Sequence, residues 1–369
     1  MKVAFDHQIF LQEYGGISRY FVELAKNIPK VSEDKSHVNI IAPLYTNEYL
    51  ACSLEQVSAW GMRVPNIPGT KRIIRKANEQ ISSVVLNQFR PGLIHETYYA
   101  KKVLGPEGTK RVITVYDMIH ELFPQFFPKS DRTSQIKKIA IDRADHVICI
   151  SENTRNDLVN ILGVDRNRTS VIYLGFALSA TKESFLKQRK PFLLYVGSRG
   201  GYKNFEGLVK AYANSPRLVD YVDLVCFGGG SFKADELSLL EKLKLPEGCT
   251  SQVTGGDELL AQYYGNATLF VYPSLYEGFG IPPLEAMSYG CAVACSNTSS
   301  MPEVVDDSAV LFDPHSSDSM VCALEKIVFD SEERETLVAN GYQRIQRFSW
   351  KKCTKETYDV YKKVLKCEL

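Results

Sequence analysis

The stretch at residues 270–287, FVYPSLYEGFGIPPLEAM, constrains the fold of this 369-residue chain more than any other. Its apolar start is typical of a buried strand. Its two adjacent prolines suit the first turn of a helix, where their missing N–H groups would have no intrahelical partner. Gly278 and Gly280 let the backbone between strand and helix approach a ligand closely. Unpaired N–H groups at such a helix start favour an anion, above all a phosphate, so we predict a strand, a ligand-binding loop and a helix.

Two glutamates lie eight positions apart in this stretch. We expect Glu277 in the loop and Glu285 in the first helical turn. In the simplest interpretation, Glu285 complements the helix dipole and the glycines only form a turn. The joint presence of both carboxylates, both glycines and the proline pair favours a ligand site instead.

The sequence EGFGIPPLEAM, with Glu277 and Glu285 in an E-x7-E arrangement, resembles the donor-binding signature of family 4 glycosyltransferases, mannosyltransferases among them. The flanking segments YYGNA, residues 263–267, and SSMPEV, residues 299–304, agree with it. The resemblance implies an α/β fold of the GT-B type, with two Rossmann-like doubly wound domains that face a central cleft. It also implies that Glu277 holds hydroxyls of the donor sugar, that Glu285 holds the ribose hydroxyls, and that transfer retains the anomeric configuration.

Strand and helix patterns alternate along the rest of the chain, which is typical of parallel sheets covered by helices. A chain of this length is too long for one ordinary core. We predict a first, acceptor-binding domain at residues 1–178 and a second, donor-binding domain at 179–349, with a weakly periodic linker at 175–191. A final helix at about 350–369 can pack back on the first domain, as the resemblance to GT-B enzymes implies.

In the first domain, a strand at residues 2–5 leads to Gly15 and Gly16 and then to a helix. The G-x-G-x-x-G pattern of dinucleotide-binding folds is missing, which argues against NAD. The family places a glycine-rich turn here, facing the phosphates and sugar of the donor. His95 is expected directly after a strand at 92–94, where a structural role and an acceptor contact are equally open.

Asp117 and His120 follow a strand predicted at residues 111–116. Many family members carry a His-Asp pair at this point, with the histidine close to the transferred sugar. Here Tyr116 replaces that histidine, and His120 lies three positions after Asp117. We assign support of the transferred sugar to Asp117, with His120 as the alternative.

In the second domain, a strand at residues 191–196 runs into the loop GSRGGYKNF, residues 197–205. Arg199 and Lys203 can clamp a diphosphate from one side, although loop cations are often only solvated. The segment matches the V-G-x-x-x-x-K-N text of the family, but Tyr202 stands where many relatives have arginine. Arg199 is therefore the candidate for that missing charge.

The family seats the nucleotide base between two loops, here the glycines at 228–230 and the segment after a weak strand at 250–254. A helix at 257–264 follows, with Asp257 as its expected N-cap. The predicted catalytic residues are Asp117, Arg199, Lys203 and Glu277. The predicted donor-binding residues are Gly15, Gly16, His120, Ser198, Arg199, Lys203, Val253, Glu277, Gly278, Phe279, Gly280, Ile281 and Glu285. The sequence contains no D-x-D motif that would hold a divalent cation, so we expect neither a metal nor another cofactor.

Composition and charge argue against several other classes of protein. A net charge of +1 does not favour nucleic acid as a partner. Nine scattered cysteines without a C-x-x-C pair indicate reduced thiols. The chain opens on a strand without a signal peptide and has no apolar run that could span a membrane, so we expect it in the cytoplasm. The basic segment KRIIRK, residues 71–76, is either a solvated helix or one that docks on the inner face of the membrane, where lipid-linked acceptors reside.

We therefore expect a retaining glycosyltransferase of polysaccharide biosynthesis. It would move a hexosyl group, with mannosyl preferred, from a nucleotide-diphosphate sugar to a glycan or lipid-linked glycan acceptor, and we prefer a GDP-sugar to a UDP-sugar as donor. One alternative is a GT-B protein that binds nucleotide sugars or glycans without turnover, and another is a dinucleotide oxidoreductase. The combination of Lys203, Glu277 and Glu285 argues against the first, and the missing G-x-G-x-x-G against the second.

Overall fold

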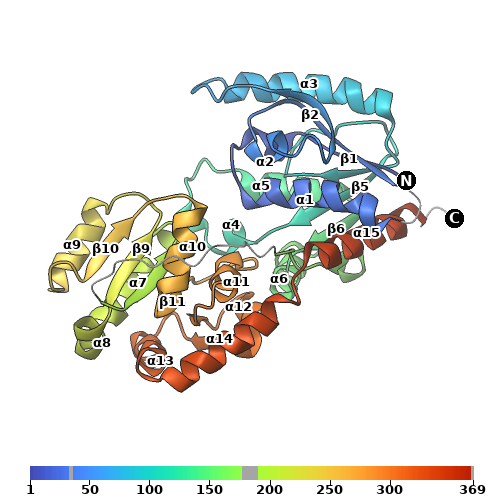
Figure 1. Ribbon diagram of the computed structural model, residues 1–369. Coiled ribbons are helices and arrows are strands. Elements are labelled where there is room, and N and C mark those ends of the chain that lie inside the picture. Colours follow the sequence, from blue (N-terminus) through green and yellow to red (C-terminus); the bar gives the residue numbers. More distant parts are fainter. Residues whose placement is uncertain (33–35, 177–189, 367–369) are drawn as a thin grey trace. The chain divides into compact units, whose positions relative to one another are not determined.

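The computed structural model describes residues 1–32, 36–176 and 190–366 of the chain. These residues fall into two compact units (Figure 1). Unit 1 comprises Met1–Gly175 and Phe348–Leu369, and unit 2 comprises Phe176–Arg347. The predicted domain boundary at 178 lies outside the described residues, as do residues 177–189 of the predicted linker at 175–191.

Unit 1 is built on a seven-stranded sheet in which every strand pair is parallel, in the order β3-β2-β1-β4-β5-β6-β7. Its strands are β1 Lys2–Phe5, β2 His37–Tyr45, β3 Ser58–Arg63, β4 Leu93–Glu96, β5 Lys110–Val115, β6 His146–Cys149 and β7 Thr169–Val171. Its α-helices are α1 Gly16–Val31, α2 Glu48–Ala51, α3 Lys71–Phe89, α4 Ile119–Leu122, α5 Thr133–Arg143, α6 Glu152–Leu162 and α15 Trp350–Lys366. The strand order reverses between β1 and β4, and in doubly wound sheets ligands bind at such a reversal, beyond the carboxyl ends of the strands.

Unit 2 has the same architecture around six parallel strands, in the order β10-β9-β8-β11-β12-β13. Its strands are β8 Phe192–Val196, β9 Asp223–Phe227, β10 Thr250–Val253, β11 Leu269–Tyr272, β12 Val293–Ser296 and β13 Val310–Phe312. Its α-helices are α7 Phe205–Ala213, α8 Pro216–Tyr221, α9 Ala234–Lys242, α10 Asp257–Asn266, α11 Ile281–Ser288, α12 Met301–Val305, α13 Ser317–Phe329 and α14 Ser331–Ile345. The predicted α/β class, with two parallel sheets, is confirmed.

Local sequence signals explain where several of these elements begin and end. Strands β4, β5 and β6 are almost entirely buried, which is typical of parallel strands covered on both faces. Helix α6 begins after Ser151, whose hydroxyl accepts a hydrogen bond from the backbone N–H of Thr154. It ends at Gly163, which adopts the left-handed conformation that suits a helix C-cap.

Helix α15 follows unit 2 in sequence but packs against α1 in unit 1, as Figure 1 also shows. The hydroxyl of Tyr358 lies 3.2 Å from Oγ of Ser36. The hydroxyl of Tyr361, fully buried, lies 2.6 Å from Nδ1 of His95. The last helix therefore contributes to the core of the first unit.

We expected His95 directly after its strand, but it lies inside β4 and is fully buried. Its Nε2 lies 2.9 Å from the hydroxyl of Thr114, so with Tyr361 both ring nitrogens have hydrogen-bond partners. Burial lowers the pKa of His95 to about 3, which keeps the ring neutral. Of the two roles left open for His95, the structural one fits this position.

Candidate functional site

The loop between β11 and α11 is the centre of the candidate site in unit 2. Gly280 has a φ of 97°, a left-handed conformation that favours glycine, and a Cβ atom there would lie 2.1 Å from Cε of Met301. The Ser300 hydroxyl donates to the carbonyls of Glu277 and Phe279, at 2.9 and 3.0 Å. Residues at the start of α12 thus fix the shape of the loop, a role that the SSMPEV text suggested only through the family resemblance.

Glu277 and Lys203, both predicted site residues, form an ion pair. Nζ of Lys203 donates to Oε1 of Glu277 at 2.6 Å, and both side chains are mostly buried. Nζ also lies 3.5 Å from the hydroxyl of Tyr272, the last residue of β11. Burial first, and then the charge of Glu277, hold the pKa of Tyr272 well above its usual value, so this hydroxyl remains neutral. Sequence reasoning did not identify Tyr272 as part of the site.

The two loops that carry this ion pair are fastened to each other. Asn204 adopts a left-handed conformation with a φ of 54°, and its side chain donates to the carbonyls of Pro273 and Pro314, at 3.1 and 3.0 Å. The backbone N–H of Leu275 donates to the carbonyl of Tyr202 at 2.8 Å. Because the loops are tied in this way, Lys203 and Glu277 are held in place before any ligand binds. The K-N pair of the family text was the available signal for Asn204.

We expected Glu285 in the first turn of its helix, but it lies beyond that turn. It is the fifth residue of α11, whose first turn holds no acidic residue and begins at Ile281, just before the proline pair. The dipole effect fades within the first turn, so the dipole interpretation of Glu285 loses its main support. The half-buried carboxylate instead accepts a hydrogen bond of 3.3 Å from the hydroxyl of Tyr264 on α10.

Arg199 is not open to a diphosphate in this structure, which corrects the predicted clamp. Its side chain is 1% exposed and pairs with Glu236 on α9, with N–O distances of 3.0 and 3.1 Å. Its Nη1 also donates to the carbonyl of Gly228 and its Nη2 to those of Gly230 and Ser231, each at 2.9 Å. Arg199 therefore acts on the turn after β9 and positions it, rather than meeting a ligand directly.

The loops predicted to seat the nucleotide base lie together at the ends of β9 and β10. Gly228, Gly229 and Gly230 all have positive φ, and the N–H of Gly228 donates to the carbonyl of Val253 at 2.8 Å. The helix that follows is capped by Gly256, without a side-chain bond, so the prediction that Asp257 is the N-cap was wrong. Asp257 is the first residue of α10.

Asp117 in unit 1 is held by a buried lysine. Its Oδ1 accepts from the N–H of Ile119 at 3.1 Å, and its carbonyl accepts from Nζ of Lys137 at 2.8 Å. Lys137, on α5, is 1% exposed, and its Nζ also lies 2.7 Å from Oε2 of Glu121. The Asp117 carboxylate is partly exposed, so it remains available to a ligand while its backbone is fixed.

His120 lies close by on α4. Its ring stacks on that of Phe127, with the ring centroids 3.9 Å apart. Within the described part of the chain, its buried Nδ1 has no hydrogen-bond partner. A buried polar atom without a partner is costly, which makes His120 a candidate for contact with a ligand.

Gly15 and Gly16 lie at the start of α1, with Gly15 as the N-cap. A Cβ atom at Gly16 would have nothing within 4 Å, so the backbone is approachable there. Nearby residues line a cavity of about 330 Å³ in the same unit, among them Tyr14, Tyr49 and the exposed Cys52.

The predicted site residues thus fall into two sets. Gly15, Gly16, Asp117 and His120 lie in unit 1, whereas Ser198, Arg199, Lys203, Val253, Glu277, Gly278, Phe279, Gly280, Ile281 and Glu285 lie in unit 2. Ser198 is exposed and uses its carbonyl to accept a bond from Tyr195. Among the described residues, no group of three or more His, Cys, Asp or Glu side chains is arranged to hold a metal ion. No helix in the described ranges is long and apolar enough to cross a membrane.

Comparison with known proteins assigns the chain to a family. Residues 14–180 match the family model described as Glycosyltransferase Family 4, and residues 179–344 match Glycosyl transferases group 1. O-antigen chain mannosyltransferase B of Escherichia coli is 26% identical, over 98% of this chain and 100% of its own length. The serotype-specific mannosyltransferase WbdA of Escherichia coli is 31% identical over 59% of this chain, but this covers only 29% of WbdA.

A solved structure shows the same fold. HepE from Anabaena, in complex with UDP and glucose, superposes with a TM-score of 0.71 at 17% identity, covering 98% of this chain and 99% of its own. The GT-B fold expected from the resemblance is confirmed. With both halves matched by glycosyltransferase models and mannosyltransferases among its relatives, the chain belongs to the family 4 glycosyltransferases.

Proposed function

We propose that this sugar transferase moves a hexosyl group, by preference mannosyl, from a nucleotide-diphosphate sugar to a glycan or lipid-linked glycan acceptor, with retention. The observation that carries the proposal is the Lys203–Glu277 pair of 2.6 Å beside the start of α11. Two joined loops that bring a cation, a carboxylate and a helix start together suit a ligand with both phosphates and sugar hydroxyls. The named relatives act as mannosyltransferases, and HepE was solved with UDP and glucose.

In the proposed reaction, the departing nucleoside diphosphate gains negative charge. Lys203 and the N–H groups around Ile281 stabilise that charge, and electrostatic stabilisation of this kind is usually the largest single contribution to catalysis. Glu277 accepts hydroxyls of the sugar, and Glu285 accepts those of the ribose. Asp117 supports the transferred sugar, with His120 as the second candidate, and the acceptor hydroxyl attacks from the face that the diphosphate leaves.

A turnover assay with a panel of nucleotide sugars tests the proposal. The chain is incubated with GDP-mannose, UDP-glucose or UDP-galactose and a glycan acceptor, and the anomeric configuration of the product is read by NMR. We expect an α-linked product from an α-linked donor, and loss of product in Glu277→Gln. Donor binding without any turnover would favour the non-catalytic alternative, and an inverted product would contradict the proposed mechanism.

Metal independence is a separate prediction about the same site. Positive potential at the proposed diphosphate position comes from Lys203 and a helix start, which can replace the electrostatic role of a divalent cation. We expect transfer to survive excess EDTA, measured as initial rate with and without chelator. An activity that EDTA abolishes and Mg²⁺ or Mn²⁺ restores would contradict the site assignment as a whole.

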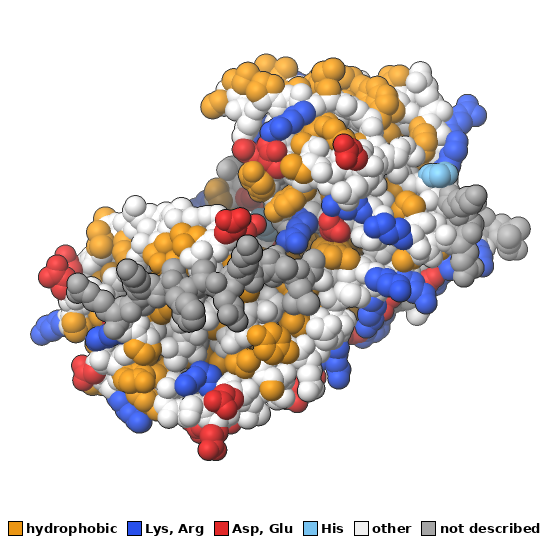
Figure 2. Space-filling view, viewed as in Figure 1, with side chains coloured by type: hydrophobic (Ala, Val, Ile, Leu, Met, Phe, Trp, Pro, Cys, Tyr) orange, Lys and Arg blue, Asp and Glu red, His pale blue; other side chains and the backbone are white. Residues whose placement is uncertain are grey.

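Helix α3 suggests that the chain works at an anionic membrane surface. Ile73 and Val84, eleven positions apart, lie on one exposed face of the helix, with Arg72 and Lys76 exposed beside them. Figure 2 shows apolar side chains at the surface of the part of unit 1 that contains α3. Apolar residues flanked by cations are typical of helices that lie in a membrane interface.

Vesicle sedimentation tests this membrane proposal. We expect binding to anionic vesicles at low salt, weaker binding at high salt, and a clear loss in the double variant Ile73→Ser/Val84→Ser. Ile139→Ser is the matched control, because Ile139 is an exposed isoleucine on another helix of the same unit, α5. If the wild-type chain does not bind at low salt, α3 is an ordinary solvated helix.

A further inference from the structure

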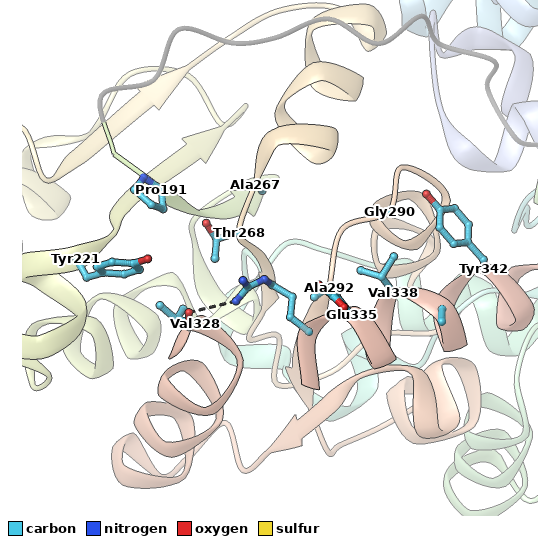
Figure 3. A pocket seen from close by; sticks show the side chains of 12 residues that line it. Pro191, Tyr221, Ala267, Thr268, Gly290, Ala292, Val328, Glu335, Val338 and Tyr342 are labelled. Atoms are coloured by element: carbon cyan, nitrogen blue, oxygen red, sulfur yellow. Dashed lines mark hydrogen bonds between the residues drawn. The ribbon is translucent and has the colours of Figure 1, made fainter. Parts of the chain in front are cut away.

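Unit 2 contains a cavity of about 500 Å³ that the proposed transfer reaction does not use (Figure 3). Residues that directly precede strands form its floor: Pro191 before β8, Thr268 before β11 and Ala292 before β12. Lys203 and Glu277 instead follow the carboxyl ends of β8 and β11. All strands of this sheet are parallel, so the cavity lies at the opposite edge from the candidate donor site.

Two tyrosine rings stand at opposite sides of the cavity, as Figure 3 shows. Tyr221, at the end of α8, is 49% exposed, and Tyr342, on α14, is 47% exposed. Tyr221 is supported by the ring of Phe329, with the centroids 5.2 Å apart. Exposed aromatic rings at a hollow offer flat apolar faces to a ligand, and their hydroxyls remain available for hydrogen bonds.

The polar groups of the cavity are fixed or unpaired. Nη1 of Arg334 donates to the carbonyls of Ile327 and Val328, at 2.8 and 3.2 Å, which anchors the guanidinium at the end of α13. Among the described residues, no partner is found for its other N–H groups, for the carboxylate of Glu335 or for the hydroxyl of Thr268. A guanidinium held in place by one nitrogen, while its other two nitrogens have donors to spare, is prepared for a ligand.

The adjacent charges narrow the class of ligand. Arg334 and Glu335 together add no net charge to the cavity, so neither an anion nor a cation is favoured, and a neutral molecule that both donates and accepts hydrogen bonds fits best. A hexose has such hydroxyls on its rim and an apolar C–H face that packs on aromatic rings. We propose that this cavity is a second carbohydrate site, which binds a neutral oligosaccharide away from the donor site. The proposal rests on the proposed function only in the choice of glycan.

Hydrogen–deuterium exchange on the full chain tests this site locally. A neutral manno-oligosaccharide is titrated without donor, and exchange is followed in peptides that cover α14. We expect protection of these peptides in the wild type. In Tyr342→Ala and Glu335→Ala, the oligosaccharide concentration that gives half-maximal protection should be about tenfold higher. Tyr342→Phe keeps the ring and should keep most of the binding. Glu332→Ala is the matched control, because Glu332 is an exposed glutamate on the same helix that does not line the cavity.

Three results would overturn the second site: no protection of α14, equal protection in wild type and both cavity variants, or protection by a hexose phosphate but not by the neutral sugar. The transfer reaction is measured separately. We expect Glu335→Ala to leave the initial rate on a short acceptor unchanged. A wild-type chain that shows cavity binding but no transfer would contradict the proposed function and support the second site.

Discussion

Lys203 and Glu277 form an ion pair at the centre of the candidate site. Each is mostly buried, so each would be costly to leave without the other, and Tyr272 closes the pair from the side of β11. A donor diphosphate would compete with Glu277 for the ammonium group. In the proposed reaction, the lysine that pairs with Glu277 in this structure would stabilise the charge of the leaving group.

Lys203→Ala should slow transfer roughly a hundredfold, because a preoriented charge near the departing phosphate is lost. It should weaken the binding of a nucleoside monophosphate much less, since the proposed role of Lys203 is toward the distal phosphate. Single-turnover rates and calorimetric titrations with mono- and diphosphate measure the two effects. Lys210→Ala removes an exposed lysine of α7 and should change neither. Equal loss of affinity for monophosphate and diphosphate would contradict the assignment of Lys203 to the distal phosphate.

At the scale of elements, α4 and α5 form one rigid support for Asp117. Lys137 brings together the carbonyl of Asp117 and the carboxylate of Glu121, and its ammonium also lies 5.5 Å from the ring of Tyr99. The adjacent Lys138 pairs with Asp142, and both side chains are exposed to solvent. Two neighbouring lysines on one helix thus have opposite environments.

Lys137→Met should lower the free energy of unfolding by roughly 3–5 kcal/mol, because it leaves Glu121 buried without its partner. Lys138→Met should change it by less than about 0.5 kcal/mol, as expected for an exposed pair within a helix. Urea denaturation of both variants provides the measurement. A similar loss in both variants would mean that the buried pair is no stronger than an exposed one.

Elements whose signal is local were predictable from the sequence. The ends of β8 and β10 and the helix start at Ile281 lie within a residue or two of the expected positions. These features depend on runs of apolar residues or on proline, which act on their near neighbours. The E-x7-E text likewise located the loop that carries Glu277.

Side-chain partners that are distant in sequence were not predictable. Arg199 looked like a loop cation, but Glu236 and the carbonyls of Gly228, Gly230 and Ser231, about thirty or more residues away, surround it. The hydrogen bond that orients the His95 ring comes from Tyr361, near the other end of the chain. Neither partner leaves a pattern in the local sequence.

At the scale of the whole molecule, three buried histidines are confined to unit 1. Burial lowers the pKa of His7 and His146 to about 4 and that of His95 to about 3, from an unfolded value near 6.5. Above pH 6.5 these rings are neutral in both states and add no pH dependence. Below pH 6.5, the unfolded chain binds protons that the folded chain does not bind. The stability of the folded state therefore decreases as the pH is lowered, until the pH reaches the pKa values of the folded state.

We therefore expect unit 1 to lose stability between pH 6.5 and 4, by up to about 1.4 kcal/mol per pH unit for each histidine. Burial raises the pKa of Asp6 and Glu96, which opposes this trend. The histidine part is isolated by comparing wild type with His95→Gln, whose stability should fall less steeply, in urea titrations at several pH values. His37→Gln, at an exposed site, is the control. Parallel slopes for wild type and His95→Gln would contradict the assignment.

The return of α15 to unit 1 has a consequence for how the chain is made. A ribosome delivers the strands of unit 1 first, yet the Tyr361 hydroxyl that pairs with His95 arrives only after all of unit 2 has emerged. Unit 2 is continuous in sequence and can fold as soon as it is released, whereas unit 1 must wait with part of α1 uncovered. The half of the molecule that is started first is therefore the half that is finished last.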